Sequence, residues 1–213
     1  MQIFATQAQR IVGLTKKGKD FFKLTSSLSE PINHIVVEET RMWTSCEFVY
    51  NMYDNGKDVA YYMSRDQINS MVVDQVTRSN DYDPILGCQD SCLRIVQGSN
   101  LSFEVPTAAA VTALTSMYGD EPRYRTGPAH VAAGLGTGEV SMIQLRPNGE
   151  FSCVWSVQDS RRSSINCMRA FDINRDGVTE VIVGREDGRL EILGQDGDAS
   201  TPTVRFSKNV GEG

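Results

Sequence analysis

The chain is a succession of short stretches in which apolar and polar residues largely alternate. Residues 139–145 (EVSMIQL) and 189–193 (RLEIL) are two examples. A period of two places successive side chains on opposite faces of a β-strand. Turn residues separate the stretches, and the pair Asn55 and Gly56 is typical of a tight β-hairpin. The pattern therefore predicts an all-β chain of short, consecutive strands.

A glycine-containing pattern recurs at regular intervals. Residues 184–192 (GREDGRLEI) align with 134–142 (GLGTGEVSM) and with 87–95 (GCQDSCLRI), and a weaker match begins at Ala5. The steps between the leading glycines, from 87 to 134 and from 134 to 184, are 47 and 50 residues. Repeats of about 40–50 residues with four short strands each are typical of β-propeller blades. Because one blade cannot bury its own faces, each blade must pack against its neighbours.

The repeat divides the chain into blades of one partial β-propeller that covers residues 1–213, with no second domain. No inner strand precedes the first stretch, so the first blade is expected to be truncated, and four to five four-stranded blades are expected. In the second blade, residues 42–51 (MWTSCEFVYN) are expected to form a single strand. Both ends fall inside a repeat, as expected for part of a larger ring. The expected blade bounds are 1–30, 31–66, 67–107, 108–158 and 159–213.

Oxygen-bearing side chains alternate in a loop of the last blade. Loop positions one, three, five and nine, with an inward-pointing carbonyl at position seven, would line one concave side, and Gly177 permits the tight turn. Hard oxygen ligands at this spacing suit calcium. The loop is similar to the calcium loop of the FG-GAP repeat in integrin-type propellers. The candidate metal ligands are Asp172, Asn174, Asp176, Val178 through its carbonyl, and Glu180.

Two observations limit the calcium interpretation. An EF-hand needs a bidentate glutamate at position twelve between two helices, whereas that position is Val183 and the flanking residues are strand-like. The same spacing also suits Asx-type turns, in which Asp172 and Asn174 bond only to backbone groups and no metal is held. Calcium is thus the one cofactor that the residues suggest, and a metal-free turn is the open alternative.

Composition and charge narrow the classes of function. The 213 residues are 40% hydrophobic and 23% charged, and the net charge of −6 does not favour a nucleic-acid surface. No apolar run approaches the length of a membrane span, and the N-terminus lacks the pattern of a signal peptide. The five cysteines are odd in number and form no CxxC pair, which favours reduced thiols in the cytoplasm.

No arrangement of residues predicts an enzyme. His34 and His130 lie on different predicted strands, without a serine or cysteine in a recognisable nucleophile motif. Gly134, Gly136 and Gly138 could suggest a phosphate-binding loop, but such a loop precedes a helix, and the residues that follow here read as a strand. We therefore expect a hairpin turn at these glycines and no catalytic residues.

Several stretches of sequence carry a family resemblance. They are TKKGKDFF, EFVYNMY with the later YYMSRDQIN, LGCQDSCLRIVQGSN followed by EVPT, and DINRDGVTEVIVGREDGRLEI. In this order, and over nearly the whole chain, they resemble the N-terminal β-propeller of the family of the seventh Bardet–Biedl syndrome protein, a subunit of the BBSome. The resemblance implies that these blades belong to a seven-bladed ring.

The resemblance also implies a function. It implies a non-catalytic scaffold, or protein-interaction propeller, in ciliary membrane-protein trafficking. The expected partners are other BBSome-type subunits and, as a further expectation, ciliary membrane-protein cargo, with no nucleic acid and no direct membrane insertion. The expected location is the cytoplasm, the cilium and the basal body. Exposed loops at 74–83, 119–128 and 158–164 are the expected contact sites.

A different class of propeller is the alternative. An integrin-like, calcium-binding adhesion propeller would also contain a loop such as 172–180. The odd cysteine count and the missing signal peptide oppose this alternative. Integrin-type rings also carry several calcium loops, whereas the pattern occurs once in this sequence.

Overall fold

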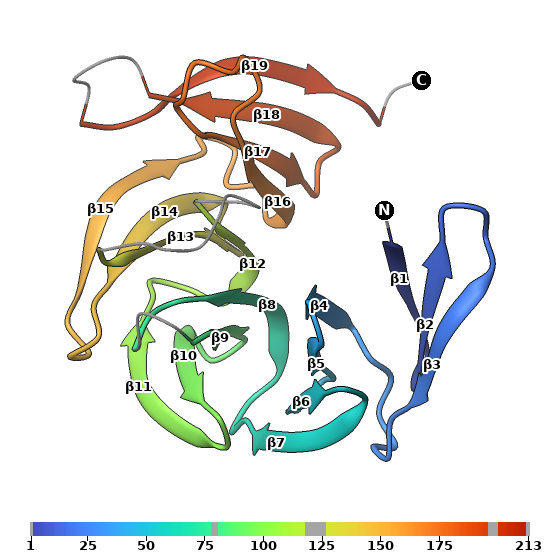
Figure 1. The fold of residues 1–213 in the computed structure, drawn as a ribbon. Helices are drawn as coiled ribbons and strands as arrows, with labels where there is room; N and C mark the ends of the chain where they lie inside the picture. Colours follow the sequence, from blue (N-terminus) through green and yellow to red (C-terminus); the bar gives the residue numbers. More distant parts are fainter. Residues whose placement is uncertain (1, 78–80, 118–126, 196–199, 212–213) are drawn as a thin grey trace. The chain divides into compact units, whose positions relative to one another are not determined.

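The structure of the chain, a computed structural model, describes residues 2–77, 81–117, 127–195 and 200–211. These residues form nineteen β-strands, which Figure 1 shows coloured along the sequence. The all-β fold class predicted from the alternating pattern is confirmed. Within the described ranges, no helix is long and apolar enough to cross a membrane.

The strands form five sheets, and in each sheet a strand pairs with its neighbours along the chain. Four sheets have four strands and the first has three. Short connections between consecutive strands are compatible with antiparallel pairing, which these sheets show. The sheets are β1 (Gln2–Gln7), β2 (Arg10–Thr15) and β3 (Asp20–Thr25); β4 (His34–Glu38), β5 (Arg41–Ser45), β6 (Val49–Asp54) and β7 (Lys57–Met63); β8 (Ile68–Asp74), β9 (Asp83–Cys88), β10 (Cys92–Gln97) and β11 (Asn100–Pro106); β12 (Val111–Ser116), β13 (Ala129–Leu135), β14 (Glu139–Leu145) and β15 (Phe151–Gln158); and β16 (Ile165–Phe171), β17 (Glu180–Arg185), β18 (Arg189–Gly194) and β19 (Thr203–Asn209).

The single strand expected at residues 42–51 is wrong. This run divides into β5 and β6, because the chain turns at 46–48 and the amide of Cys46 donates to the carbonyl of Val49 at 2.8 Å. The turn contains no glycine, proline, asparagine or aspartate, the residues that normally mark a turn in a sequence. In the structure, the change from buried Cys46 to exposed Phe48 marks this turn.

The chain divides into two compact units. The first comprises residues 1–68 with 98–100, and the second comprises residues 69–97 with 101–213. In the first unit, the sheets β1–β3 and β4–β7 share an apolar core that includes Ile11, Met42 and Tyr53. Burying such side chains is the main source of stability for a blade that cannot cover its own faces.

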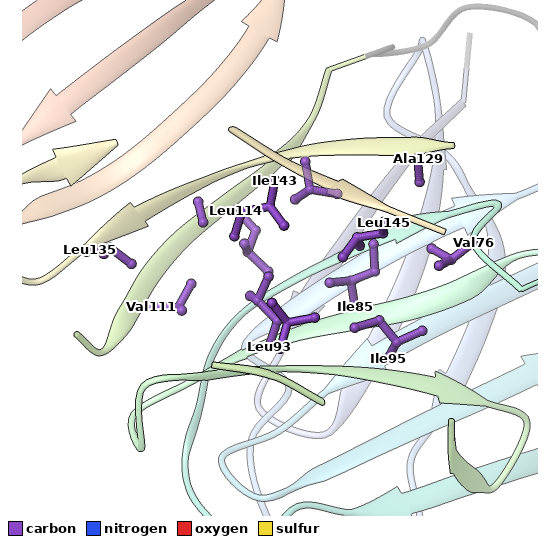
Figure 2. Packing of buried hydrophobic residues seen from close by; sticks show 13 residues of the cluster. Val76, Ile85, Leu93, Ile95, Val111, Leu114, Ala129, Leu135, Ile143 and Leu145 are labelled. Carbon is purple, nitrogen blue, oxygen red and sulfur yellow. The ribbon is translucent and has the colours of Figure 1, made fainter. Parts of the chain in front are cut away.

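Two apolar clusters hold the second unit together. In the first cluster, thirteen buried side chains join the sheet β8–β11 to the sheet β12–β15. Figure 2 shows Leu93 and Ile85 of one sheet facing Leu114 and Leu145 of the other. The second cluster joins β12–β15 to β16–β19; its buried members are Ala113, Ala132, Val140, Trp155, Ile165, Val181, Val183 and Leu193.

The repeated glycine has a packing role. A Cβ atom added at Gly87 in β9 would lie 2.6 Å from a methyl group of Val111, which begins β12. A Cβ atom added at Gly134 in β13 would lie 2.7 Å from a methyl group of Ile165, which begins β16. Real Cβ atoms do not approach so closely, so each glycine leaves a recess for the first β-branched residue of the next blade.

The turn that follows this glycine also repeats. Its third residue has a positive φ in three blades, at Ser91 (59°), Gly138 (85°) and Gly188 (81°). The glycine cluster therefore includes a hairpin turn, at residues 136–138 between β13 and β14, as the sequence predicts, while Gly134 itself lies in β13. The weaker match at Ala5 does not share this geometry, because only two residues separate β1 from β2 and the left-handed residue is Ala8 (51°).

Candidate functional site

The predicted calcium ligands lie in the loop between β16 and β17, where their side chains bond to the loop itself. The carboxylate of Asp172 accepts the amides of Asp176 at 3.1 Å and Gly177 at 2.9 Å. Asn174 accepts the amide of Asp176 at 3.0 Å and donates its side-chain amide to the Asp176 carboxylate at 2.8 Å. Asp176 accepts the amide of Val178 at 2.8 Å. These are the Asx-type bonds that the spacing allows without a metal.

Glu180, the fifth predicted ligand, is buried at the first position of β17. One of its carboxylate oxygens accepts the amide of Ile173 at 3.0 Å, and the other lies 3.6 Å from a guanidinium nitrogen of Arg205. A cation bound by Glu180 would therefore have to share this carboxylate with an arginine, and two positive charges beside one carboxylate repel each other.

The loop geometry accounts for the alternating residues through hydrogen bonds. Bonds from the Val178 amide and the Asn174 side chain hold the pKa of the Asp176 carboxyl below its usual value. No group of three or more histidine, cysteine, aspartate or glutamate residues is arranged around a common point within the ranges that the structure describes. Calcium binding at Asp172, Asn174, Asp176, Val178 and Glu180 stays a prediction.

A network of buried charges, which the sequence does not reveal, joins the last two blades. Arg189 in β18 donates two hydrogen bonds to Asp159, at 3.1 and 2.6 Å, from two different guanidinium nitrogens. It also bonds to Glu191 at 2.9 Å and to Asp187 at 2.6 Å. Asp159 lies just after β15, in the segment that connects β15 to β16. Arg189 therefore links the last blade to the segment that precedes it.

Arg185 in β17 extends the network across the same junction. Its Nε donates to Glu191 at 2.6 Å, and its Nη1 donates to the backbone carbonyls of Gly138 at 2.9 Å and Ser163 at 3.2 Å. Its side chain is 1% exposed. Gly138 belongs to the hairpin of the preceding blade, so a single guanidinium bonds to two blades and to the segment between them.

The network strongly perturbs one titrating group. The Arg189 guanidinium holds the pKa of the Asp159 carboxyl well below its usual range, even though burial alone would raise it. In the sequence, the charged residues of the network look like ordinary surface residues, because Arg and Glu in a strand are usually exposed to solvent. The one available signal is that Arg189 and Glu191 alternate with Leu190, which shows that charged side chains occupy one face of β18.

A smaller version of this arrangement braces the β9–β10 turn. Arg94, whose side chain is 2% exposed, forms a bidentate pair with Asp90 and a 3.0 Å bond with Glu104 in β11. Asp90 occupies the turn position that Asp187 occupies in the last blade. In two of the three aligned blades, a buried arginine thus fixes the aspartate of this turn, although Arg94 and Arg189 stand at different positions of the repeat.

The loop at 158–164, a predicted contact site, is fixed by hydrogen bonds. Asp159 is buried and accepts the amide of Ser163 at 3.1 Å, and the Ser163 hydroxyl accepts the amide of Asp187 at 3.1 Å. Its exposed residues include Arg161 and Arg162, so a contact surface at this loop would present arginines on a rigid backbone.

The other two predicted contact loops are described only in part. In the loop at 74–83, buried Asp83 accepts the amides of Val76 at 3.3 Å and Thr77 at 2.7 Å, while residues 78–80 lie outside the described residues. Most of the loop at 119–128 also lies outside the described residues. The contact role of all three loops stays a prediction.

The two histidines hydrogen-bond to polar side chains of neighbouring strands. The Nδ1 atom of His34 lies 3.0 Å from the hydroxyl of Ser45, but Ser45 is fully buried, so a substrate has no access to that hydroxyl. Burial also lowers the pKa of His34. The Nε2 atom of His130 lies 3.0 Å from the side-chain amide of Gln144, which is not a nucleophile.

A cavity of about 210 Å³ opens between the end of β11 and the strands β13–β15. Among the described residues that line it, Glu139 is the one carboxylate, and it accepts a hydrogen bond from Ser141 at 2.6 Å. The thiol of Cys153 lines the same wall, and burial together with the charge of Glu139 raises its pKa, which disfavours the reactive thiolate. The lining residues are Val105, Pro106, Thr107, Ala108, Ala133, Leu135, Glu139, Ser141, Ile143, Phe151 and Cys153.

Comparison with known proteins places this architecture among BBSome propellers. The family described as the BBS7 beta-propeller matches residues 1–213. The mouse BBSome complex member BBS7 is 32% identical over 212 residues, which is 99% of this chain and 29% of the mouse protein. The Caenorhabditis elegans BBSome complex member bbs-7 is 24% identical over 90% of this chain and 26% of its own length. The chain thus spans less than a third of these relatives.

More distant similarities agree with this fold. Human BBSome complex member BBS2 is 24% identical over 64% of this chain and 17% of its own length. Among solved structures, BBS1N in complex with ARL6DN has a TM-score of 0.68 and 13% identity over 98% of this chain and 64% of that one. The WD40 β-propeller domain of Doa1 has a TM-score of 0.72 and 10% identity over 98% of this chain and 65% of its own. The predicted β-propeller architecture is therefore confirmed.

Proposed function

Because the chain belongs to the BBS7 β-propeller family, we propose that it is a non-catalytic scaffold propeller of a BBSome-like complex. The match of the BBS7 family over residues 1–213 carries this proposal. In this role the blades present loops and strand edges to neighbouring subunits, and the complex moves membrane proteins in cilia. Ciliary membrane-protein cargo, and a location in the cytoplasm, the cilium and the basal body, are parts of the same proposal.

The physical properties of the described residues support a scaffold. Each blade is an antiparallel sheet whose strands are joined by short turns, and the blades of each unit pack through apolar cores. Such packing resists deformation, so loops between strands keep fixed positions. The relatives named as BBSome complex members include both BBS7 and BBS2, which favours other BBSome-type subunits as partners.

The adhesion alternative loses its support. The family that matches is a BBSome family, and the calcium loop, on which an integrin-like propeller would depend, stays a prediction. A non-catalytic role is also favoured by the family, whose members are named as BBSome complex subunits.

Affinity purification from extracts of ciliated cells tests the proposal. The tagged chain and the longest natural polypeptide that contains it are used as baits, and bound proteins are identified by quantitative mass spectrometry. We expect BBSome subunits, with BBS2-type and BBS1-type proteins among them, to be enriched at least tenfold over a tag-only control. Capture of no BBSome subunit by either folded bait would refute the proposal.

Two variants distinguish specific binding of BBSome subunits by the folded chain from non-specific binding by unfolded chain. Arg189→Met removes the buried guanidinium of the network, so it should reduce the folded fraction and the capture together. Arg146→Met removes an exposed arginine paired with Glu150, so it should change neither. Capture that rises as the chain unfolds would identify the bound subunits as contaminants.

A further inference from the structure

Two cysteines lie directly opposite each other in the β9–β10 hairpin. Cys88 ends β9 and Cys92 begins β10, and the two residues are partners in the antiparallel register. Directly opposite residues in such a pair project their side chains from the same face of the sheet. The other three cysteines lack this arrangement, because Cys153 is opposite Ile143, Cys167 is opposite Gly184, and Cys46 lies in the turn between β5 and β6.

The backbone spacing of this pair suits a disulfide. Opposite residues in antiparallel strands have Cα atoms about 4.5 or 5.5 Å apart, depending on the hydrogen-bonding position. Disulfides join Cα atoms that are about 4.4–6.8 Å apart. Both Cα spacings fall inside the range that disulfides tolerate. A bond between Cys88 and Cys92 therefore needs only a small adjustment, which brings the Cβ atoms from about 4.5–5.5 Å to about 3.5–4.5 Å apart, and no separation of the strands.

The surroundings distinguish the roles of the two thiols. Cys88 is fully buried, and hydrogen bonds to Asp90 and to Cys88 raise the pKa of the Arg94 guanidinium in the same hairpin. A fixed guanidinium favours the thiolate form of a neighbouring cysteine, and Asp90 and Glu104 fix this one. Cys92 is half-buried, so a small reagent in solution can reach it, and because burial and the charge of Glu104 raise its thiol pKa, the exchange should speed up as pH rises. The accessible thiol and the thiol beside a cation are thus adjacent.

We propose that Cys88 and Cys92 form a reversible disulfide when the protein meets a low-molecular-weight disulfide such as oxidised glutathione. The Cys92 thiolate attacks the reagent, forms a mixed disulfide and releases one glutathione thiolate. The Cys88 thiolate then attacks the Cys92 sulfur and releases the second. Two cysteine thiols lose two protons and two electrons, and one glutathione disulfide becomes two glutathione molecules. An excess of reduced glutathione reverses both steps.

The disulfide would reinforce a turn that contacts the inner strand of its own blade and the connection to the next blade. The Gln89 side chain in this turn accepts the side-chain amide of Asn69 in β8 at 2.8 Å. The carbonyl of Ser91 accepts the amide of Thr107, which lies between β11 and β12, at 2.9 Å. The positions of Cys88 and Cys92 are those of Arg185 and Arg189 in the last blade. The disulfide would thus join the two repeat positions that hold buried arginines in the last blade.

Peptide mapping tests the proposal directly, because trypsin releases both cysteines in one peptide, residues 79–94 (SNDYDPILGCQDSCLR). The folded protein is equilibrated in glutathione buffers of graded ratio, quenched with acid, alkylated and digested. We expect a form of this peptide that has lost two hydrogen atoms and takes up no alkylating agent. Treatment with reduced glutathione should restore two alkylation sites.

Three controls make the experiment decisive. Cys92→Ser should abolish the hydrogen loss, whereas the double variant Cys153→Ser, Cys167→Ser should leave it unchanged. In urea the same two cysteines should form the disulfide with an equilibrium constant at least tenfold smaller, since the unfolded chain does not hold them opposite each other. An equal or larger equilibrium constant in urea would overturn the proposal. So would alkylation of both Cys88 and Cys92 in glutathione buffers that are oxidising enough to form mixed disulfides at Cys153 or Cys167.

Discussion

Two junctions between neighbouring blades in the second unit share a docking pattern but differ in what they bury. The apolar junction joins the sheet β8–β11 to β12–β15, and the charged junction joins β12–β15 to β16–β19. In both, a β-branched residue of the following blade occupies the recess at a glycine, Val111 at Gly87 and Ile165 at Gly134. In both, the inner strands are also joined by a hydrogen bond of 3.0 Å: the Leu114 amide donates to the Ser70 hydroxyl, and the Ala170 amide donates to the Thr115 hydroxyl.

The difference lies beside this shared pattern. The apolar junction is stabilised by thirteen buried hydrophobic side chains, whereas the charged junction adds Asp159, Arg185, Arg189 and Glu191 to a smaller apolar cluster. Apolar burial stabilises in proportion to the area removed from water. Buried charges gain little over an apolar replacement, but one left without its partner is costly. The charged junction should therefore be sensitive to the loss of one group and to acid.

The largest effect is expected from a broken charge pair. Arg189→Met removes the donor of two bonds to Asp159 and leaves that buried carboxylate without its main partner. The free energy of unfolding, measured by urea denaturation, should fall by about 3–5 kcal/mol. Arg146→Met breaks an exposed ion pair and should change it by about 0.5 kcal/mol or less. Equal effects for the two variants would show that the charged junction contributes no more than surface ion pairs.

Truncation in the apolar junction should have the next largest effect. Leu93 is fully buried between the two sheets, and Leu93→Ala removes its contacts and leaves a cavity. We expect the free energy of unfolding to fall by about 2–4 kcal/mol. Val154→Ala in β15 truncates a side chain that is 44% exposed and should cost about 0.5 kcal/mol or less. A loss below about 1 kcal/mol at Leu93 would contradict the tight packing of this junction.

The sequence predicts the local features of the fold but not the contacts between blades. Strands, hairpins and the repeat follow from local patterns; Asn55 and Gly56, for example, both adopt the positive φ that their turn signal implies. The turn at 46–48 was missed because no residue in it marks a turn. The charge network was missed because Asp159 and Arg189 are 30 positions apart, and only the packing of two blades brings them together.

The acidic loop shows another limit of the sequence. The alternation of Asp172, Asn174 and Asp176 predicts a tight, oxygen-lined turn, which the structure contains. The same pattern serves both a cation and a set of backbone amides, so the spacing alone does not distinguish them. The repeated glycine is similar: its period predicts blades, but its role as a recess depends on Val111 and Ile165, which belong to the following blades.

A matched pair of glycine substitutions tests the shared docking pattern. Gly134→Ala would place a methyl group 2.7 Å from Ile165 of the next blade, so the two blades must move apart or repack. We expect a loss of about 1–3 kcal/mol in the free energy of unfolding. Gly184→Ala meets the sulfur of Cys167 at 2.7 Å, the end of a side chain that can rotate, and should cost less. The reverse order would show that the recess does not fix the distance between blades.

Acid should weaken the charged junction selectively. The pKa of Asp159 is held below its unfolded value by Arg189, so its stabilising contribution is present above the unfolded pKa of about 3.9 and is lost as pH falls through the folded pKa. Asp83 in the apolar junction's first sheet has the opposite shift, since burial raises its pKa, so its charged form destabilises the fold as pH rises. Urea midpoints measured between neutral pH and pH 3 should fall less steeply for Asp159→Asn than for the unmodified chain. An unchanged slope would exclude Asp159 as the acid-sensitive group.

The smallest effect is expected outside both junctions, in the loop between β16 and β17. Asp176→Ala removes the acceptor of the Val178 amide and the partner of Asn174, so the melting temperature should fall by about 2–4 °C. Asp176→Asn keeps an acceptor for the amide and should recover part of this loss. These bonds act without a metal, so the fall measured by thermal unfolding in EDTA reports them alone, and the predicted calcium site should add a further fall in calcium. An equal fall in calcium and in EDTA would assign the loop to hydrogen bonding without a cation.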